Sequence, residues 1–182
     1  MKELSMNILD ILHNSVHANP KNIYLTILED SSKDLLQFTV KDDGKGMSQE
    51  YASKVFDPFT TSSSTKNVGL GLPFLKIQCE MCNGSAHLTS KEGLGTEVEF
   101  SFQLSHVDRP PMGDLAGTLT IMFTMHHYIS FHFKYCKDHQ CFELSTDELK
   151  SLMQDVPLQH PKVAKGIEDY INTNLTELQG GY

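Results

Sequence analysis

The fold is decided by two glycine-punctuated stretches taken together, VKDDGKGM at residues 40–47 and VGLGLPF at residues 68–74. The first follows a β-rich run and predicts a tight turn at the end of a strand. The second opens a helical pattern at about 72–81, which Asn83 and Gly84 close. A carboxylate at a strand end can accept a hydrogen bond from an exocyclic amine, and glycines before a helix let a phosphate approach its bare N–H groups. Each stretch alone is equally typical of an ordinary turn.

Helical and strand patterns alternate around these two stretches. Apolar residues recur at helical spacing from Leu4 to Val16, which predicts a helix at about 3–18. We predict further helices at about 48–55, 146–154 and 161–178, and strands at about 23–28, 36–40, 85–90, 95–104, 118–125 and 128–136. This order predicts an α+β fold, a two-layer α/β sandwich with helices on one face of a largely antiparallel sheet.

Composition indicates a soluble globular chain. Of 182 residues, 39% are hydrophobic and 21% charged, which is far from the profile of a disordered chain. No apolar run approaches the ~20 residues of a membrane span, and no basic segment followed by an apolar one opens the sequence. We therefore expect a cytoplasmic protein. Four cysteines do not indicate a disulfide scaffold in a chain of this size.

The charge balance limits the ligands. A net charge of −8 disfavours a nucleic-acid or anionic-membrane surface, so neither is expected as a partner. Arg109 is the only arginine, so any phosphate must be held by backbone amides, a metal ion or lysine instead of an arginine fork. Arg109 itself lies in DRPP, where a salt bridge within the linker and a contact to a partner's nucleotide are both open.

Asp10, Asn14 and His17 form a polar stripe on the first predicted helix. Their spacing places them within roughly 60° of one another, opposite the apolar face. Taken alone, such a stripe is more typical of a solvated helix face. The amide oxygen of Asn14 is, however, a hard ligand suited to Mg²⁺.

In order and spacing, the motifs resemble the GHKL superfamily of gyrase-type topoisomerases, heat-shock chaperone ATPases, histidine kinases and mismatch-repair ATPases. Within it, the chain is similar to stand-alone bacterial histidine-kinase-like ATP-binding proteins. The resemblance covers about residues 1–104 and rests on five segments: LDILHNSVHA, VKDDGKGM, FDPFTTSSST, VGLGLPF and GLGTEVEF.

The resemblance implies a Bergerat fold that binds ATP with Mg²⁺ under a lid at 56–68. Asn14 would then bridge the phosphates through Mg²⁺, and Asp42 would accept from the adenine amino group, directly or with a water that Thr96 also holds. Gly44, Gly46 and Met47 would flank the base, and Lys66 would contact the γ-phosphate. The remaining nucleotide-binding positions implied by the resemblance are His17, Gly69, Leu70, Gly71 and Leu72.

One departure from the family bears on catalysis. Hydrolysing members carry a glutamate four residues before the asparagine, and sensor kinases usually carry asparagine there; this chain has Asp10. Aspartate can act as a general base if its water lies within ~3 Å. Only thirteen residues precede Asn14, so no phosphoacceptor hairpin is expected upstream.

Three functions stay open from the sequence: a regulatory protein whose lid closes on ATP and hydrolyses it slowly, a Ser/Thr or His kinase acting on a partner in trans, and a non-catalytic nucleotide sensor. The expected partners are ATP and an unidentified soluble protein, and a homodimer is left open. We predict an ATP-binding domain at 1–104, a linker at 105–117 and an α+β extension of unknown role at 118–182.

The extension invites a metal hypothesis that the strand pattern weakens. If the strand alternates, its aromatic residues face one side and its His and Cys residues the other, where polar residues are normal anyway. The candidate ligands are His126, His127, His132, Cys136, His139 and Cys141. Cys79 and Cys82 lie one helical turn apart and are expected in the core.

Overall fold

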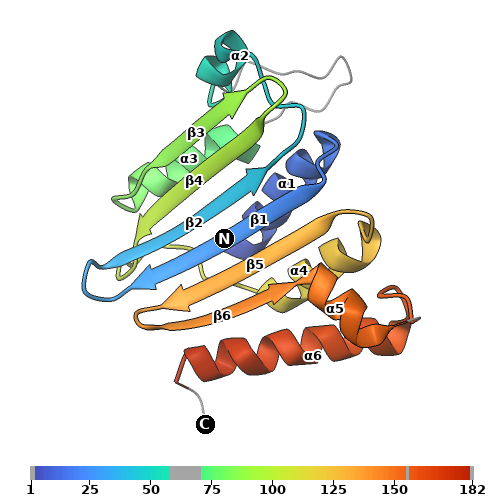
Figure 1. The fold of residues 1–182 in the computed structure, drawn as a ribbon. Helices are drawn as coiled ribbons and strands as arrows, with labels where there is room; N and C mark the ends of the chain where they lie inside the picture. The colour runs from blue at the N-terminus through green and yellow to red at the C-terminus, as the bar shows by residue number, and fades with distance from the viewer. Residues whose placement is uncertain (1–2, 58–70, 155, 181–182) are drawn as a thin grey trace.

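The computed structural model describes residues 3–57, 71–154 and 156–180, in which six strands form one sheet in the order β3-β4-β2-β1-β5-β6 (Figure 1). The elements follow one another as α1 (Leu4–His17), β1 (Asn22–Asp30), β2 (Leu35–Asp42), α2 (Gln49–Lys54), α3 (Gly71–Met81), β3 (Ala86–Lys91), β4 (Gly95–Gln103), α4 (Leu115–Met125), β5 (Ser130–Lys137), β6 (Gln140–Ser145), α5 (Thr146–Met153) and α6 (Pro161–Leu178). The predicted α+β sandwich is confirmed.

Helices α1, α3 and α4 lie together behind the sheet in Figure 1, and α6 runs along its β6 side. The apolar face of α1 is buried against the sheet, as its helical spacing predicted, and Asn19 ends the helix with a positive φ of 53°. The opposite face of the sheet is more polar, because β1 and β2 alternate buried and exposed positions along their length.

The sheet is antiparallel except where β5 pairs with β1. In that parallel pair, Leu25 is opposite Phe133 and Ile27 is opposite Tyr135. The C-terminal strands therefore extend the sheet of the N-terminal part and share its core. Arg109 lies in the segment that joins the two parts, and its guanidinium donates to the carbonyl oxygens of Leu104 (2.8 Å) and Pro110 (3.1 Å), so it binds the backbone of its own linker.

The strand predicted at about 118–125 is wrong, because this segment is helix α4. Its threonines, Ile121 and Phe123 favour β structure, but the Asp114 side chain caps the helix by accepting from the Gly117 N–H at 2.8 Å. Leu119 and Phe123, one turn apart, are both 1% exposed in the core. Burial on one helical face thus outweighs the intrinsic preference of the segment.

Among the described residues, no helix combines the length and apolar character needed to cross a membrane.

Candidate functional site

Asp42 stands at the carboxyl end of β2, and the residue is only 5% exposed. Its Oδ1 accepts from the Gly44 N–H at 3.0 Å, so the carboxylate fixes the loop that follows. Gly44 lies against the end of α1: a Cβ there would come within 2.7 Å of both the carbonyl oxygen and the Cβ of Ala18. Only glycine fits without a shift of the backbone.

Gly46 continues this loop with a φ of +63°, and a Cβ there would lie 2.0 Å from the Lys91 carbonyl oxygen. Gly95 is as restricted, with a φ of +100° and a Cβ position 1.9 Å from the Asp42 carbonyl oxygen. The end of β2, the end of β3 and the start of β4 therefore meet in close backbone contact, which only glycine allows at these positions.

Asp43 has a structural role beside Asp42. Its Oδ1 accepts from the N–H groups of Lys21 (2.7 Å) and Asn22 (2.9 Å), and its Oδ2 accepts from the Asn22 amide at 2.8 Å. Burial opposes ionisation, but these hydrogen bonds outweigh it and lower the pKa of Asp43. Asp43 thus holds the start of β1, whereas the adjacent Asp42 holds the loop at the end of β2.

A row of polar side chains crosses three strands at this edge. Thr96 on β4 is opposite Asp42 on one side and opposite Ser90 on the other. The hydroxyls of Ser90 and Thr96 are 2.8 Å apart, and the Met47 N–H donates to Ser90 Oγ at 2.9 Å. The predicted residues Asp42, Thr96 and Met47 are thereby brought together on one face of the sheet.

A pocket lies between α1 and the start of α3. Its lining residues are Asn7, Asp10, Ile11, Asn14, Gly71, Leu72 and Leu75. Both Asp10 and Asn14 are exposed, as the polar stripe predicted, and a Cβ on Gly71 would lie 4.0 Å from Asp10 Oδ2. An acidic and an amide oxygen donor therefore face the first turn of a helix, where backbone N–H groups favour an anion.

His17 does not line this pocket. It is exposed at the end of α1, on the side of the helix that approaches His126. Burial, followed by the nearby His13 and His17, lowers the pKa of His126. The rings of His13 and His126 meet edge to face at 5.9 Å.

Three predicted positions, Lys66, Gly69 and Leu70, lie outside the described residues, as does most of the predicted lid.

Two residues of the site were missed by the sequence analysis. Asn7 lies two turns before Asn14 on the same side of α1 and donates to the Gln78 side chain at 3.2 Å, so helical spacing could have indicated it. Ser90 is found only through the cross-strand register of β3 and β4.

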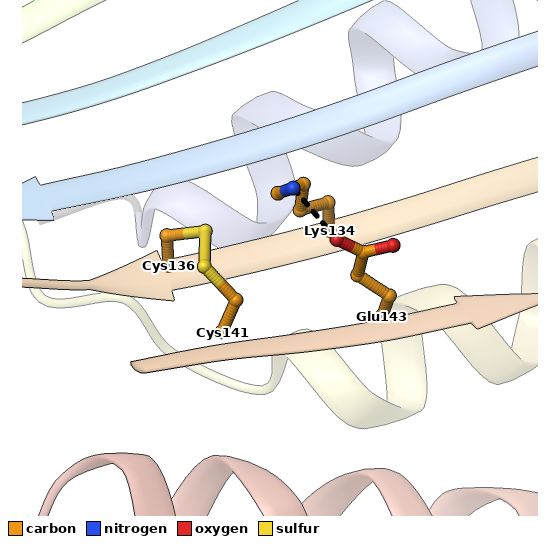
Figure 2. Close-up of a disulfide and its surroundings, with 4 residues drawn as sticks. All are labelled: Lys134, Cys136, Cys141 and Glu143. Carbon is orange, nitrogen blue, oxygen red and sulfur yellow. Dashed lines mark ion pairs between the residues drawn. A yellow bond between two sulfur atoms is a disulfide. The ribbon is translucent and has the colours of Figure 1, made fainter. Parts of the chain in front are cut away.

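The cysteines of the extension pair with each other. Cys136 and Cys141 are opposite across the β5–β6 hairpin and form a disulfide beside the ion pair of Lys134 and Glu143 (2.6 Å), as Figure 2 shows. Across the described part of the chain, no three His, Cys, Asp or Glu side chains are grouped as metal ligands, and two candidates of the metal hypothesis, Cys136 and Cys141, are bonded to each other. Cys79 and Cys82 are buried, as predicted, and burial raises the pKa of Cys79 to about 12.

Comparison with known proteins matches this fold and these motifs. The family model of the histidine kinase-, DNA gyrase B- and HSP90-like ATPases matches residues 2–106. The protein belongs to this GHKL family and contains an ATP-binding domain of the histidine kinase type.

Curated relatives resemble the N-terminal part of the chain. The sensor histidine kinase YvrG of Bacillus subtilis is 31% identical over 98 residues, covering 52% of this chain and 17% of the relative. Sporulation kinase D of the same organism is 36% identical over 98 residues, covering 54% and 19% respectively. The chain thus spans less than a fifth of the length of either relative.

A solved structure described as the N-terminal domain of a DNA repair protein is similar over more of the chain. The two structures have a TM-score of 0.58 and 13% sequence identity, and the matched region covers 87% of this chain and 55% of the other. At this identity the similarity concerns the fold alone.

Proposed function

We propose that this protein is a Mg²⁺-ATP-dependent regulatory protein whose lid closes on the nucleotide and which hydrolyses ATP slowly. The observation that supports this most directly is the placement of two complementary regions along the α1 side of the sheet. One is the polar row at the ends of β2, β3 and β4, which suits a base, and the other is the pocket at the start of α3, which suits an anion.

The base would lie against the row at the strand ends. The Asp42 carboxylate can accept from an exocyclic amine while its Oδ1 keeps the Gly44 N–H, since a carboxylate oxygen accepts more than one hydrogen bond. Gly44 and Gly46 hold this loop tightly against Ala18 and the Lys91 carbonyl, so the base would lie beside a fixed loop, in which Met47 is held through its N–H. Asp42 is almost fully buried, so a mispaired base there would leave a polar group unsatisfied.

The phosphates would lie in the pocket between α1 and α3. Gly71 and Leu72 supply the first turn of α3, and Asn14 faces it. The amide oxygen of Asn14, with no sulfur or imidazole among the lining residues of this pocket, fits the preference of Mg²⁺. When bound, Mg²⁺ would neutralise phosphate charge that a chain with one arginine cannot. Lys66 from the lid, with Gly69 and Leu70 just before α3, would complete this end.

Asp10 would act as the general base of hydrolysis. It lines the pocket one turn before Asn14, so its carboxylate would lie near a water that approaches a terminal phosphate bound there. A carboxylate that accepts a proton from this water would make it a better nucleophile.

A second candidate is a protein kinase that transfers the phosphate to a Ser, Thr or His of a partner. The similarity to YvrG and to sporulation kinase D favours it, because both are named as kinases. A non-catalytic nucleotide sensor would use the same site without turnover. In each case we propose a soluble protein partner, with a homodimer as a further state, and a cytoplasmic location.

We also propose a division of labour along the chain. Residues 1–104 would bind the nucleotide, residues 105–117 would link, and residues 118–182 would carry the response to nucleotide binding. The parallel pairing of β5 with β1 gives this last part a direct connection to the strand that precedes the site.

Calorimetric titration with ATP, with and without Mg²⁺, tests the proposal when phosphate release is followed overnight on the same sample. Mg²⁺-dependent binding with release supports an ATPase. Binding without release supports a kinase acting in trans or a sensor, and a search for labelled partner proteins with [γ-³²P]ATP separates these two. Absence of binding contradicts the proposal.

A further inference from the structure

The side-chain hydroxyl of Ser90, on β3 at the edge of the sheet, contacts three polar groups. Its Oγ accepts from the Met47 N–H at 2.9 Å, lies 3.0 Å from the Gly95 carbonyl oxygen and lies 2.8 Å from Thr96 Oγ1. Each of these partners belongs to a different part of the proposed base site: the glycine loop, the strand start and the row opposite Asp42.

A hydroxyl carries a single proton, and this determines which group donates in each of these contacts. A serine hydroxyl donates one hydrogen bond and can accept two. The Met47 N–H can only donate, and the Gly95 carbonyl can only accept, so satisfying both uses the Ser90 proton on Gly95. The contact with Thr96 is then made only if Thr96 donates to Ser90. Thr96 has thereby used its one proton and presents lone pairs on its other side.

The neighbouring position in the row is a carboxylate. Asp42 lies opposite Thr96 in the β2–β4 register and is itself an acceptor. The row therefore presents two acceptors side by side. The amino group at position 6 of a purine has two hydrogens to donate to these two acceptors, whereas a 6-oxopurine places a carbonyl oxygen there and offers only its N1–H as a donor.

We propose that Ser90 is a positioning residue that holds the Thr96 hydroxyl as an acceptor and so makes the site prefer 6-aminopurine over 6-oxopurine nucleotides. The inference rests on the proposed nucleotide function and adds to it the residue that sets base preference. Ser90 acts through Thr96, so removing its hydroxyl frees the Thr96 proton to turn toward the base.

The test compares ATP with inosine triphosphate, which differs in the group at position 6 and the protonation of N1. Calorimetry on the whole protein gives the two dissociation constants and their ratio. We expect the preference of the wild type for ATP to fall by at least about fivefold in Ser90→Ala, a change of the size of one hydrogen bond. Ser90→Thr, which keeps the hydroxyl, should retain the wild-type ratio.

Two further variants separate positioning from a general effect on the sheet. Ser101→Ala removes a serine whose hydroxyl bonds with Ser85 at the far end of β4, and it should leave the ratio unchanged. In a Thr96→Val background, Ser90→Ala should have no additional effect on the ratio, because the hydroxyl it controls is gone. Ser90→Cys keeps the side-chain volume with a weaker hydrogen-bonding group and should lower the ratio if Ser90→Ala does not fold.

The outcomes distinguish this inference from the function on which it rests. If the wild type binds ATP but Ser90→Ala weakens both nucleotides equally, or changes neither, the positioning role is wrong and the nucleotide function stands. An equal effect of Ser90→Ala with and without Thr96 also contradicts it. If the wild type binds neither nucleotide, the proposed function fails and the Ser90 inference fails with it.

Discussion

The two parts of the chain share one sheet and one core but use their polar side chains differently. At the end of β2 and the start of β4, Asp42 and Thr96 lie among glycines that allow close backbone contact between the strands. In the C-terminal part, polar groups close the structure upon itself. Ser145 and Glu148 form a capping box at the start of α5, and Thr146 accepts from the Phe131 N–H at 3.0 Å.

This difference shows where a ligand can be accommodated on a continuous sheet. Glycine-bordered strand ends offer donors and acceptors that the fold does not fully use, whereas capped helix starts offer none. The proposed nucleotide site lies in the N-terminal part, and the C-terminal part contributes to the same sheet and core. Variants in each part should separate these two roles.

Among these variants, Asp10→Asn should have the largest effect, and this effect should be confined to the rate of ATP turnover. A general base contributes ~10²–10⁴-fold to rate, so phosphate release should fall by about that factor while ATP affinity stays within a few-fold. Phosphate release and calorimetry on the same variant check this. Turnover that survives the substitution would show that another group is the base.

Phe123→Ala should affect stability instead. Phe123 is 1% exposed on α4, and its ring packs 5.5 Å from that of Phe131 on β5, so truncation should lower the free energy of unfolding by about 3–5 kcal/mol. Because the core is shared, urea unfolding should remain one transition for all probes. Two separate transitions, with the N-terminal one unchanged, would contradict the shared core.

Ser145→Ala should have a smaller effect on stability. The variant removes the capping box of α5 and should cost about 1 kcal/mol, with ATP binding unchanged. A matched control is Ser151→Ala, since Ser151 is exposed on the same helix and only bonds back to the Asp147 carbonyl. Equal destabilisation by both variants would show that the cap has no special role.

A count of reactive thiols, which needs no substitution, tests the disulfide of the C-terminal hairpin. Of four cysteines, two should react with an alkylating agent after unfolding without reductant, and all four after reduction. In the native protein, Cys79 and Cys82 should react slowly, because burial raises the pKa of both thiols. Four reactive thiols without reductant would mean that Cys136 and Cys141 are not bonded, as is usual in a reducing cytosol.

The sequence was most informative where residue type limits the backbone. Gly44 and Gly46 predicted a tight loop after a strand, and the structure shows contacts at both that exclude a side chain. Leu4 to Val16 predicted α1 because its apolar spacing matches one helical face.

The sequence was misleading where distant parts of the chain decide the outcome. The α4 segment has strand-forming residues, and only its burial beside α1 and α6 selects the helix. Ser90 and the Cys136–Cys141 pair depend on cross-strand register, which local composition does not specify.

The adjacent carboxylates Asp42 and Asp43 allow the most direct test of a nucleotide site at the strand ends. Asp42→Asn should weaken ATP binding by about 1–3 kcal/mol through a mispaired buried hydrogen bond, measured by calorimetry in the folded protein. Asp43→Asn removes the same charge one residue away, where the carboxylate holds Lys21 and Asn22, and should lower stability without a comparable loss of affinity. Unchanged ATP affinity in Asp42→Asn, or an equal loss in both variants, would contradict the account.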